Sequence, residues 1–229
     1  TRRLKATLIG RTLVPDISLT DPQVLVTMPD WLSATTGLDA LTHGVEAYVS
    51  RAASFLTDEH ALSAVALVGR HLPRSVLDPD DATARTGMAR ASLSAGLAFT
   101  NAILGAAHAI SHQVGGMLDL PHGMCNAILL PHVVRYNAVA TPERFRPLAE
   151  ALGVPGADRL PAAEVGEALG DRISDLAATI GAPRTLTGIG VTEADLPGFA
   201  AQTLHDACLT TNPRDVDEAD VLTILRAAL

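Results

Sequence analysis

The residues best suited to chemistry are an aspartate and several histidines spaced one helical turn apart. Asp39 precedes His43 by four residues, and side chains at that spacing share one face of a helix. His108 and His112 repeat the spacing further along the chain, and His122 follows near the start of another expected helix. A carboxylate and imidazoles that converge from separate helices can hold a divalent transition metal in a helical bundle.

The spacing alone leaves other interpretations open. An Asp/His pair four residues apart is common on exposed helix faces, and histidines also cap helices or form hydrogen bonds in protein cores. Nothing in the spacing says which of the four histidines would be left out of a metal site. If a site exists, oxygen and nitrogen ligands without a thiolate suit Fe(II), Zn(II), Mn(II) or a similar ion.

The composition favours packed helices as the scaffold for these residues. Of the 229 residues, 48% are hydrophobic and only 3% are aromatic, which disfavours a β-sandwich or barrel. A formal charge of −8 without a cluster of basic residues argues against a nucleic-acid partner. No apolar run reaches the roughly 18 residues of a membrane span, and no signal-peptide layout is present. Two cysteines cannot form a disulfide framework, which favours a reducing cytoplasm.

Hydrophobic periodicity predicts helices from about Asp21 onward. The predicted ranges are 37–50, 56–76, 80–99, 101–117, 119–136, 141–152, 161–180, 192–204 and 216–228. Asp119 is expected as an N-cap, and Pro131 is expected to kink or break its helix. By contrast, 4–10 and 16–20 are β-like runs, which as two lone strands would need a larger sheet. We therefore predict a mainly α protein, with a helical bundle domain over 23–229 and a short β remnant in 1–22.

Two segments around the candidate ligands resemble the signatures of the iron-containing (group III) alcohol dehydrogenases. They are TGLDALTHGVEAYVS at 36–50 and GAAHAISHQVGGMLDLPHGMCNAILLPHVVRYNA at 105–138. In that family the first motif supplies an Asp and a His to the metal. The second motif supplies the first His of its H-x-x-x-H pair and the His of its P-H-G. The resemblance therefore implies four metal ligands, which are Asp39, His43, His108 and His122.

The resemblance also implies roles for three further residues. His112, the second histidine of the H-x-x-x-H pair, corresponds to a group near the substrate that is a proposed proton relay. Lys5 and Leu25 stand at positions that contact the nicotinamide cofactor in the family. The dipeptide His205-Asp206 lacks upstream partners at a metal-binding spacing and receives no role.

The resemblance covers most of the chain and implies a metal-dependent oxidoreductase. Family members join an N-terminal dinucleotide-binding α/β domain to a helical metal domain, and residues 1–22 match the last strands of the first. The family's GGGS-type pyrophosphate motif is absent. The sequence thus looks like the C-terminal part of an enzyme, with the dinucleotide domain missing. The implied cofactors are Fe2+, with Zn2+ as an alternative, and NAD or NADP. The implied substrate is a small alcohol, aldehyde or ketone, and a homo-oligomer is left open.

Two other functions remain open from the sequence. The same four ligands could activate water in a metal-dependent lyase or hydrolase, since dehydroquinate synthase, a lyase, has a related fold. The chain could instead be a non-catalytic fragment or a subunit of a split enzyme. An adjacent dinucleotide domain would distinguish a dehydrogenase from a hydrolase, which does not need one.

Overall fold

Helices make up all the regular structure of residues 10–229, which are the residues that the computed structural model describes. The α-helices in this range are α1 (Asp30–Val49), α2 (Phe55–Leu77), α3 (Ala82–Ala102), α4 (Ala106–Leu118), α5 (His122–Ala138), α6 (Pro142–Ala151), α7 (Ala162–Thr179), α8 (Leu196–Thr203) and α9 (Glu218–Ala227). Short 3-10 helices lie between or before them: η1 (Arg11–Leu13), η2 (Pro22–Leu25), η3 (Thr187–Ile189), η4 (Glu193–Asp195) and η5 (Ala207–Thr211). The predicted mainly α fold is confirmed.

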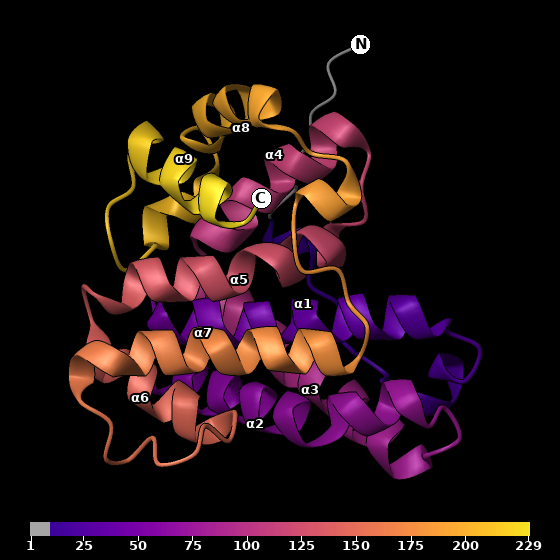
Figure 1. The fold of residues 1–229 in the computed structure, drawn as a ribbon. Helices are drawn as coiled ribbons and strands as arrows, with labels where there is room; N and C mark the ends of the chain where they lie inside the picture. The colour runs from indigo at the N-terminus through magenta and orange to yellow at the C-terminus, as the bar shows by residue number, and fades with distance from the viewer. Residues whose placement is uncertain (1–9) are drawn as a thin grey trace.

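The helices pack around two main hydrophobic cores that share α5. Figure 1 shows α1, α2, α5 and α7 as long, roughly parallel rows, with α8 and α9 on the far side of α5. The first core draws on α1, α2, α3, α5, α6 and α7, and includes the fully buried Leu41 and Leu72. The second core draws on α4, α5, α8 and α9, and includes Ile110 and Phe199. Helix α5 therefore connects the two.

Helix α1 is buried along most of its length. Thirteen of its twenty residues are buried, several of them polar. Small residues allow the close packing: a Cβ atom at Gly44 would lie 3.1 Å from Cγ2 of Val65 and 3.2 Å from the carbonyl oxygen of Ala61. Buried polar groups need hydrogen-bond partners: Thr35 and Thr42 donate to carbonyl oxygens of α1 itself, whereas Glu46 finds its partners at the start of α4.

A sharp bend separates α3 from α4, and the two helices are inclined by 103°. At the bend, Ile103 has a φ of 62° and Gly105 is extended. The sequence placed this boundary near residue 100, a few residues too early. Within residues 10–229, no single helix is long and apolar enough to cross a membrane, and α3 with α4 would qualify only as this bent pair, by length and composition.

The turn into α5 differs from the predicted one. Asp119 is not an N-cap, because it follows the end of α4 in the left-handed conformation, with a φ of 56°. Helix α5 begins three residues later, directly after Pro121, and it continues through Pro131 as far as Ala138. Proline removes one backbone hydrogen bond, but both cores hold α5, so that its packing outweighs the loss.

The segment before α1 contains no strand within the described residues. The β-like run 16–20 is not a strand, because residues 10–229 offer no neighbouring strand to accept and donate its backbone hydrogen bonds. Residues from 14 to 28 instead line, together with α1, α3 and the end of α2, an open cavity of about 920 Å³. The other β-like run, 4–10, lies outside the described residues apart from Gly10.

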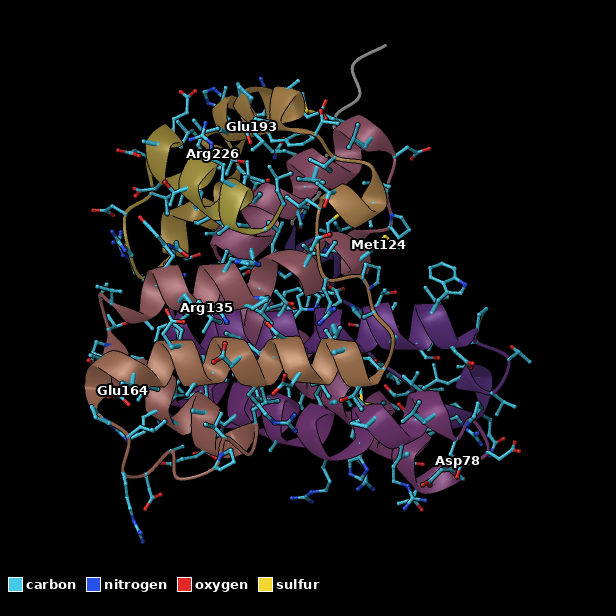
Figure 2. The ribbon with its side chains drawn as sticks, in the orientation of Figure 1. Asp78, Met124, Arg135, Glu164, Glu193 and Arg226 are labelled. Atoms are coloured by element: carbon cyan, nitrogen blue, oxygen red, sulfur yellow. The ribbon has the colours of Figure 1, made fainter. Side chains whose placement is uncertain are left out.

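Ion pairs on the surface link several of these elements. Glu193 and Arg226, labelled in Figure 2, are 2.8 Å apart and join η4 to α9. Arg135 of α5, also labelled, pairs with Glu167 and Asp171 of α7 at 2.9 and 2.6 Å. Exposed pairs of this kind contribute about 0–1 kcal/mol each, so the two cores rather than the surface charges hold the site in place.

Candidate metal centre

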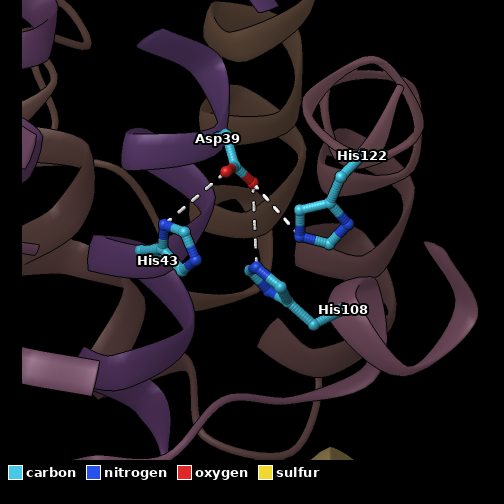
Figure 3. A group of neighbouring side chains, drawn as sticks. All are labelled: Asp39, His43, His108 and His122. Atoms are coloured by element: carbon cyan, nitrogen blue, oxygen red, sulfur yellow. Dashed lines mark ion pairs between the residues drawn. The ribbon is translucent and has the colours of Figure 1, made fainter. Parts of the chain in front are cut away.

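The four side chains expected as ligands come together where α1, α4 and α5 meet, as Figure 3 shows. Asp39 Oδ1 lies 3.7 Å from Nε2 of His108 and 3.7 Å from Nε2 of His122. Asp39 Oδ2 lies 3.9 Å from Nδ1 of His43. One oxygen or nitrogen atom from each of the four residues lies within 4.8 Å of the others. The structure thus places together every residue expected to bind the metal.

Local sequence explains how α1 and α5 position their side chains. The four-residue spacing of Asp39 and His43 puts both on one face of α1. Gly123 follows His122 at the start of α5, and a Cβ atom there would lie 2.6 Å from the carbonyl oxygen of Thr35. Only glycine therefore lets α5 begin directly against α1, which brings His122 beside Asp39.

The charges of the site suit metal ligands at neutral pH. Burial acts to raise the pKa of Asp39, but the three surrounding imidazoles outweigh it and hold the pKa below 3.8. Burial, reinforced by the neighbouring His108, lowers the pKa of His43 from 6.5 to about 4. Asp39 is therefore an anion and His43 a neutral imidazole at pH 7, which are the forms that bind a cation.

Asn126, one turn into α5, lies among the same atoms. Its Nδ2 is 2.6 Å from Oδ1 of Asp39, and it is 3.0 and 3.1 Å from Nε2 of His108 and His122. Its Oδ1 is buried and has no hydrogen-bond partner among residues 10–229. The Asp39 oxygen and the two imidazole nitrogens therefore all point at one position, which the electron-poor NH2 group of Asn126 occupies. The residues present therefore fit a divalent cation.

Glu46 supports the site from behind His108. Only 2% of its side chain is exposed, and its Oε2 is 2.6 Å from Nδ1 of His108. The same carboxylate accepts the backbone N–H groups of Gly105 and Ala107, at 3.1 and 2.6 Å. It thus satisfies otherwise unpaired donors at the start of α4. Because Glu46 takes the Nδ1 hydrogen, Nε2 of His108 is left to face the other ligands, as in carboxylate–histidine–metal arrangements.

His112 lies beside the four-residue group without joining it. It is one turn beyond His108 on α4, and its ring stacks on that of His122 with centroids 5.3 Å apart. Its Nδ1 is 2.8 Å from Oδ2 of Asp206. Asp206, which received no role from the sequence, is therefore at the edge of the site, whereas the adjacent His205 is exposed.

The residues expected to contact the cofactor lie apart from this group. Leu25 ends η2, is half-buried and lines the 920 Å³ cavity between residues 14–28, α1 and α3. None of the four grouped residues is among those that line this cavity. Lys5 lies outside the described residues.

Comparison with known proteins agrees with the two motifs. The model of the Fe-containing alcohol dehydrogenase family, C-terminal, matches residues 33–229. The chain belongs to the Fe-containing alcohol dehydrogenase family. The match confirms the predicted family and its C-terminal part, and it includes α1, α4 and α5, the helices that carry the grouped side chains.

Relatives in the Fe-containing alcohol dehydrogenase family match almost the whole chain. The chain is 43% identical to 1,3-propanediol dehydrogenase of Klebsiella pneumoniae, over 99% of the chain and 58% of that protein. It is 38% identical to the NAD-dependent methanol dehydrogenase of Bacillus methanolicus, over 100% and 60%. An alcohol dehydrogenase structure from Oenococcus oeni superposes with a TM-score of 0.89 at 36% identity, over 91% and 54%. The chain thus spans 58–60% of the length of these two curated relatives.

Three residues of the site were missed by the sequence prediction. Glu46 follows His43 by three residues and Asn126 follows His122 by four, so the helical spacing that revealed the histidines could also have revealed these two. Asp206 gives no comparable signal, because its partner His112 is 94 residues away in the sequence.

Proposed function

We propose that this chain forms the metal-binding part of a dehydrogenase that transfers hydride between NAD(P) and a small alcohol or its aldehyde or ketone. The observation that carries the proposal is the grouping of Asp39, His43, His108 and His122 in a member of this family. Relatives named for propanediol and methanol support a small alcohol as the substrate class.

Asp39, His43, His108 and His122 would hold one divalent metal, with Fe2+ as the first choice and Zn2+ as the alternative. One carboxylate oxygen and three imidazole nitrogens suit either ion. When bound, the ion supplies a Lewis acid for the oxygen of the substrate. Glu46 keeps Nε2 of His108 directed toward the other ligands.

His112 would serve as the proton relay. It shares a helix face with His108, and only 7% of the residue is exposed. Its Nδ1 is engaged by Asp206, so its Nε2 is the atom that can take the proton of a substrate hydroxyl. NAD(P) would accept the hydride, and the protein would supply the position and the electrostatic field.

Domain and cofactor roles also follow for the rest of the chain. Residues 1–22 would be the end of a dinucleotide-binding domain and 23–229 the helical metal domain, with Lys5 and Leu25 in contact with the cofactor. The position of Leu25 in the wall of a large cavity supports its assignment. We also propose a cytoplasmic location, which a chain with only two cysteines favours.

Metal analysis of the purified chain tests this function. After reconstitution with Fe2+ or Zn2+, we expect one bound ion per chain, and a large loss of bound ion in His108→Ala and in His122→Ala. His112→Ala should retain the ion, and His60→Ala, at an exposed position on α2, is a control outside the site. If His108→Ala and His122→Ala both keep the stoichiometry of the unmodified chain, the proposed ligand set is wrong.

A further inference from the structure

Asp206 is fixed in place by several hydrogen bonds at the edge of the candidate metal centre. It precedes η5, and its Oδ1 accepts the backbone N–H of Cys208 at 2.9 Å. Its Oδ2 is 2.8 Å from Nδ1 of His112 and accepts from Nε2 of Gln113 at 3.3 Å. Both carboxylate oxygens are thus engaged, and the side chain is only 13% exposed. A carboxylate held this firmly can define the orientation of its partner.

The charge of Asp206 decides which atom donates in this contact. Burial acts to raise its pKa, but the hydrogen bonds from His112 and from the Cys208 backbone outweigh this effect, and the net pKa is lowered. An ionised carboxylate has no hydrogen to donate. The hydrogen between Asp206 and His112 must therefore be carried by Nδ1 of the imidazole, and in the neutral ring Nε2 then carries none.

The position of His112 makes this tautomer relevant to proton transfer beside the candidate ligands. Its ring stacks on His122 with an interplanar angle of 17°, and it lies one turn from His108 on the same helix. With Nδ1 occupied, the ring cannot rotate about χ2 without breaking the bond to Asp206. Nε2 therefore stays available as a proton acceptor beside the metal ligands.

We propose that Asp206 is a positioning residue that holds His112 in the Nδ1–H tautomer, so that Nε2 is ready to accept the proton of the substrate. This inference rests on the proposed function, because it deepens the role given to His112. Asp206, His112 and Cys208 also have the composition of a second metal site. The carboxylate is already fully engaged, however, and burial together with the charge of Asp206 strongly raises the pKa of the Cys208 thiol. The three residues thus form a hydrogen-bond network.

The matched pair of variants is Asp206→Asn and Asp206→Ala. The amide oxygen of asparagine can still accept the Cys208 N–H and preserve the start of η5, but its NH2 group cannot accept a hydrogen from His112. Alanine removes both acceptors. In a well-characterised Asp–His pair of a serine protease, the Asn variant keeps the geometry and loses about 10⁴-fold in turnover through the wrong tautomer. Cys208→Ser is the control, because it leaves the carboxylate in place.

Nitrogen-15 NMR of the Zn2+-loaded chain measures the tautomer directly, with the His112 signals assigned by their loss in His112→Ala. We expect protonated Nδ1 and unprotonated Nε2 in the unmodified chain and in Cys208→Ser, and loss of this single tautomer in Asp206→Asn. Zinc stoichiometry should remain one in all of them. An unchanged His112 tautomer in Asp206→Asn would overturn the proposal, as would loss of zinc together with the tautomer or a second zinc ion lost on Cys208→Ser. If the unmodified chain binds neither Fe2+ nor Zn2+ while Asp206→Asn still changes the tautomer in the metal-free protein, the positioning role stands and the proposed function fails.

Discussion

Replacing Glu46 by alanine should weaken both the fold and the binding of metal. Its buried carboxylate accepts from the N–H groups of Gly105 and Ala107 and engages Nδ1 of His108. Alanine would leave three backbone donors at the first turn of α4, those of Gly105, Ala107 and His108, and the imidazole donor of His108 without this partner.

The size of the effect follows from these donors. Each buried donor left without a partner costs about 1–3 kcal/mol. Water entering the space left by the side chain would recover part of this cost, so we expect a loss of about 3–5 kcal/mol for the four together. That is a large share of the roughly 5–15 kcal/mol by which domains are stable. Loss of the partner that orients a histidine ligand should also weaken metal binding by about 10–100-fold.

Two measurements separate these effects. Guanidinium unfolding of the metal-free chain reports stability, and competition with a chelator reports Zn2+ affinity. Glu46→Gln keeps one acceptor oxygen and should lose less stability than Glu46→Ala. Glu59→Ala, at an exposed position on α2, is the control and should change stability by less than about 0.5 kcal/mol. If Glu46→Ala unfolds within about 1 kcal/mol of the unmodified chain, Glu46 does not hold the start of α4. If stability falls but zinc affinity does not, it does not orient His108 for the metal.

Two further predictions concern acid and nucleotide. Burial lowers the pKa of His43 from 6.5 to about 4, so between these values the unfolded chain binds a proton that the folded chain does not. The metal-free chain should therefore lose up to about 3 kcal/mol of stability as the pH falls through this window. Denaturation midpoints above and below it, compared with those of His43→Asn, measure the effect, and a flat profile in the unmodified chain would contradict it. Calorimetric titration of the metal-loaded chain with NAD and NADP should show little binding, because the chain lacks the glycine-rich motif that cradles a pyrophosphate. Micromolar binding of either nucleotide would show that the cofactor site has been misplaced.

Hydrophobic periodicity predicted the mainly α fold, whereas the set of four candidate ligands came from the resemblance to the family motifs, since the spacing alone did not say which histidine to leave out. Asp39 and His43 share one face of any regular helix because they are four residues apart. His108 and His122 lie within one recognisable motif. The run 16–20 was misread because the alternation of apolar residues says nothing of whether a neighbouring strand exists, and in the structure Ile17 and Leu19 are 78% and 93% exposed. Asp119 was misread because an aspartate before a proline suits an N-cap as well as the left-handed end of the preceding helix.

Contacts between distant segments explain what the sequence did not predict. The bond between Asp206 and His112 depends on how α8 and η5 pack against α4, and no periodicity in either segment reports that packing. The exact position of the bend at Ile103 also depends on tertiary structure, since the sequence placed this boundary near residue 100. The residues that orient the candidate ligands were therefore harder to predict than the ligands themselves.

If the four grouped side chains bind the proposed ion, the position of the candidate centre between helices of both cores would link the survival of the folded chain to metal supply. The grouped side chains come from α1, α4 and α5, so an unfolded chain offers no preformed site. Binding to the folded state alone shifts the folding equilibrium, and free metal at a thousand times its dissociation constant adds about 4 kcal/mol of stability. A cell short of the metal would then lose the protein to its proteases as well as the activity of each molecule. The abundance of such a chain would itself report on the availability of the ion.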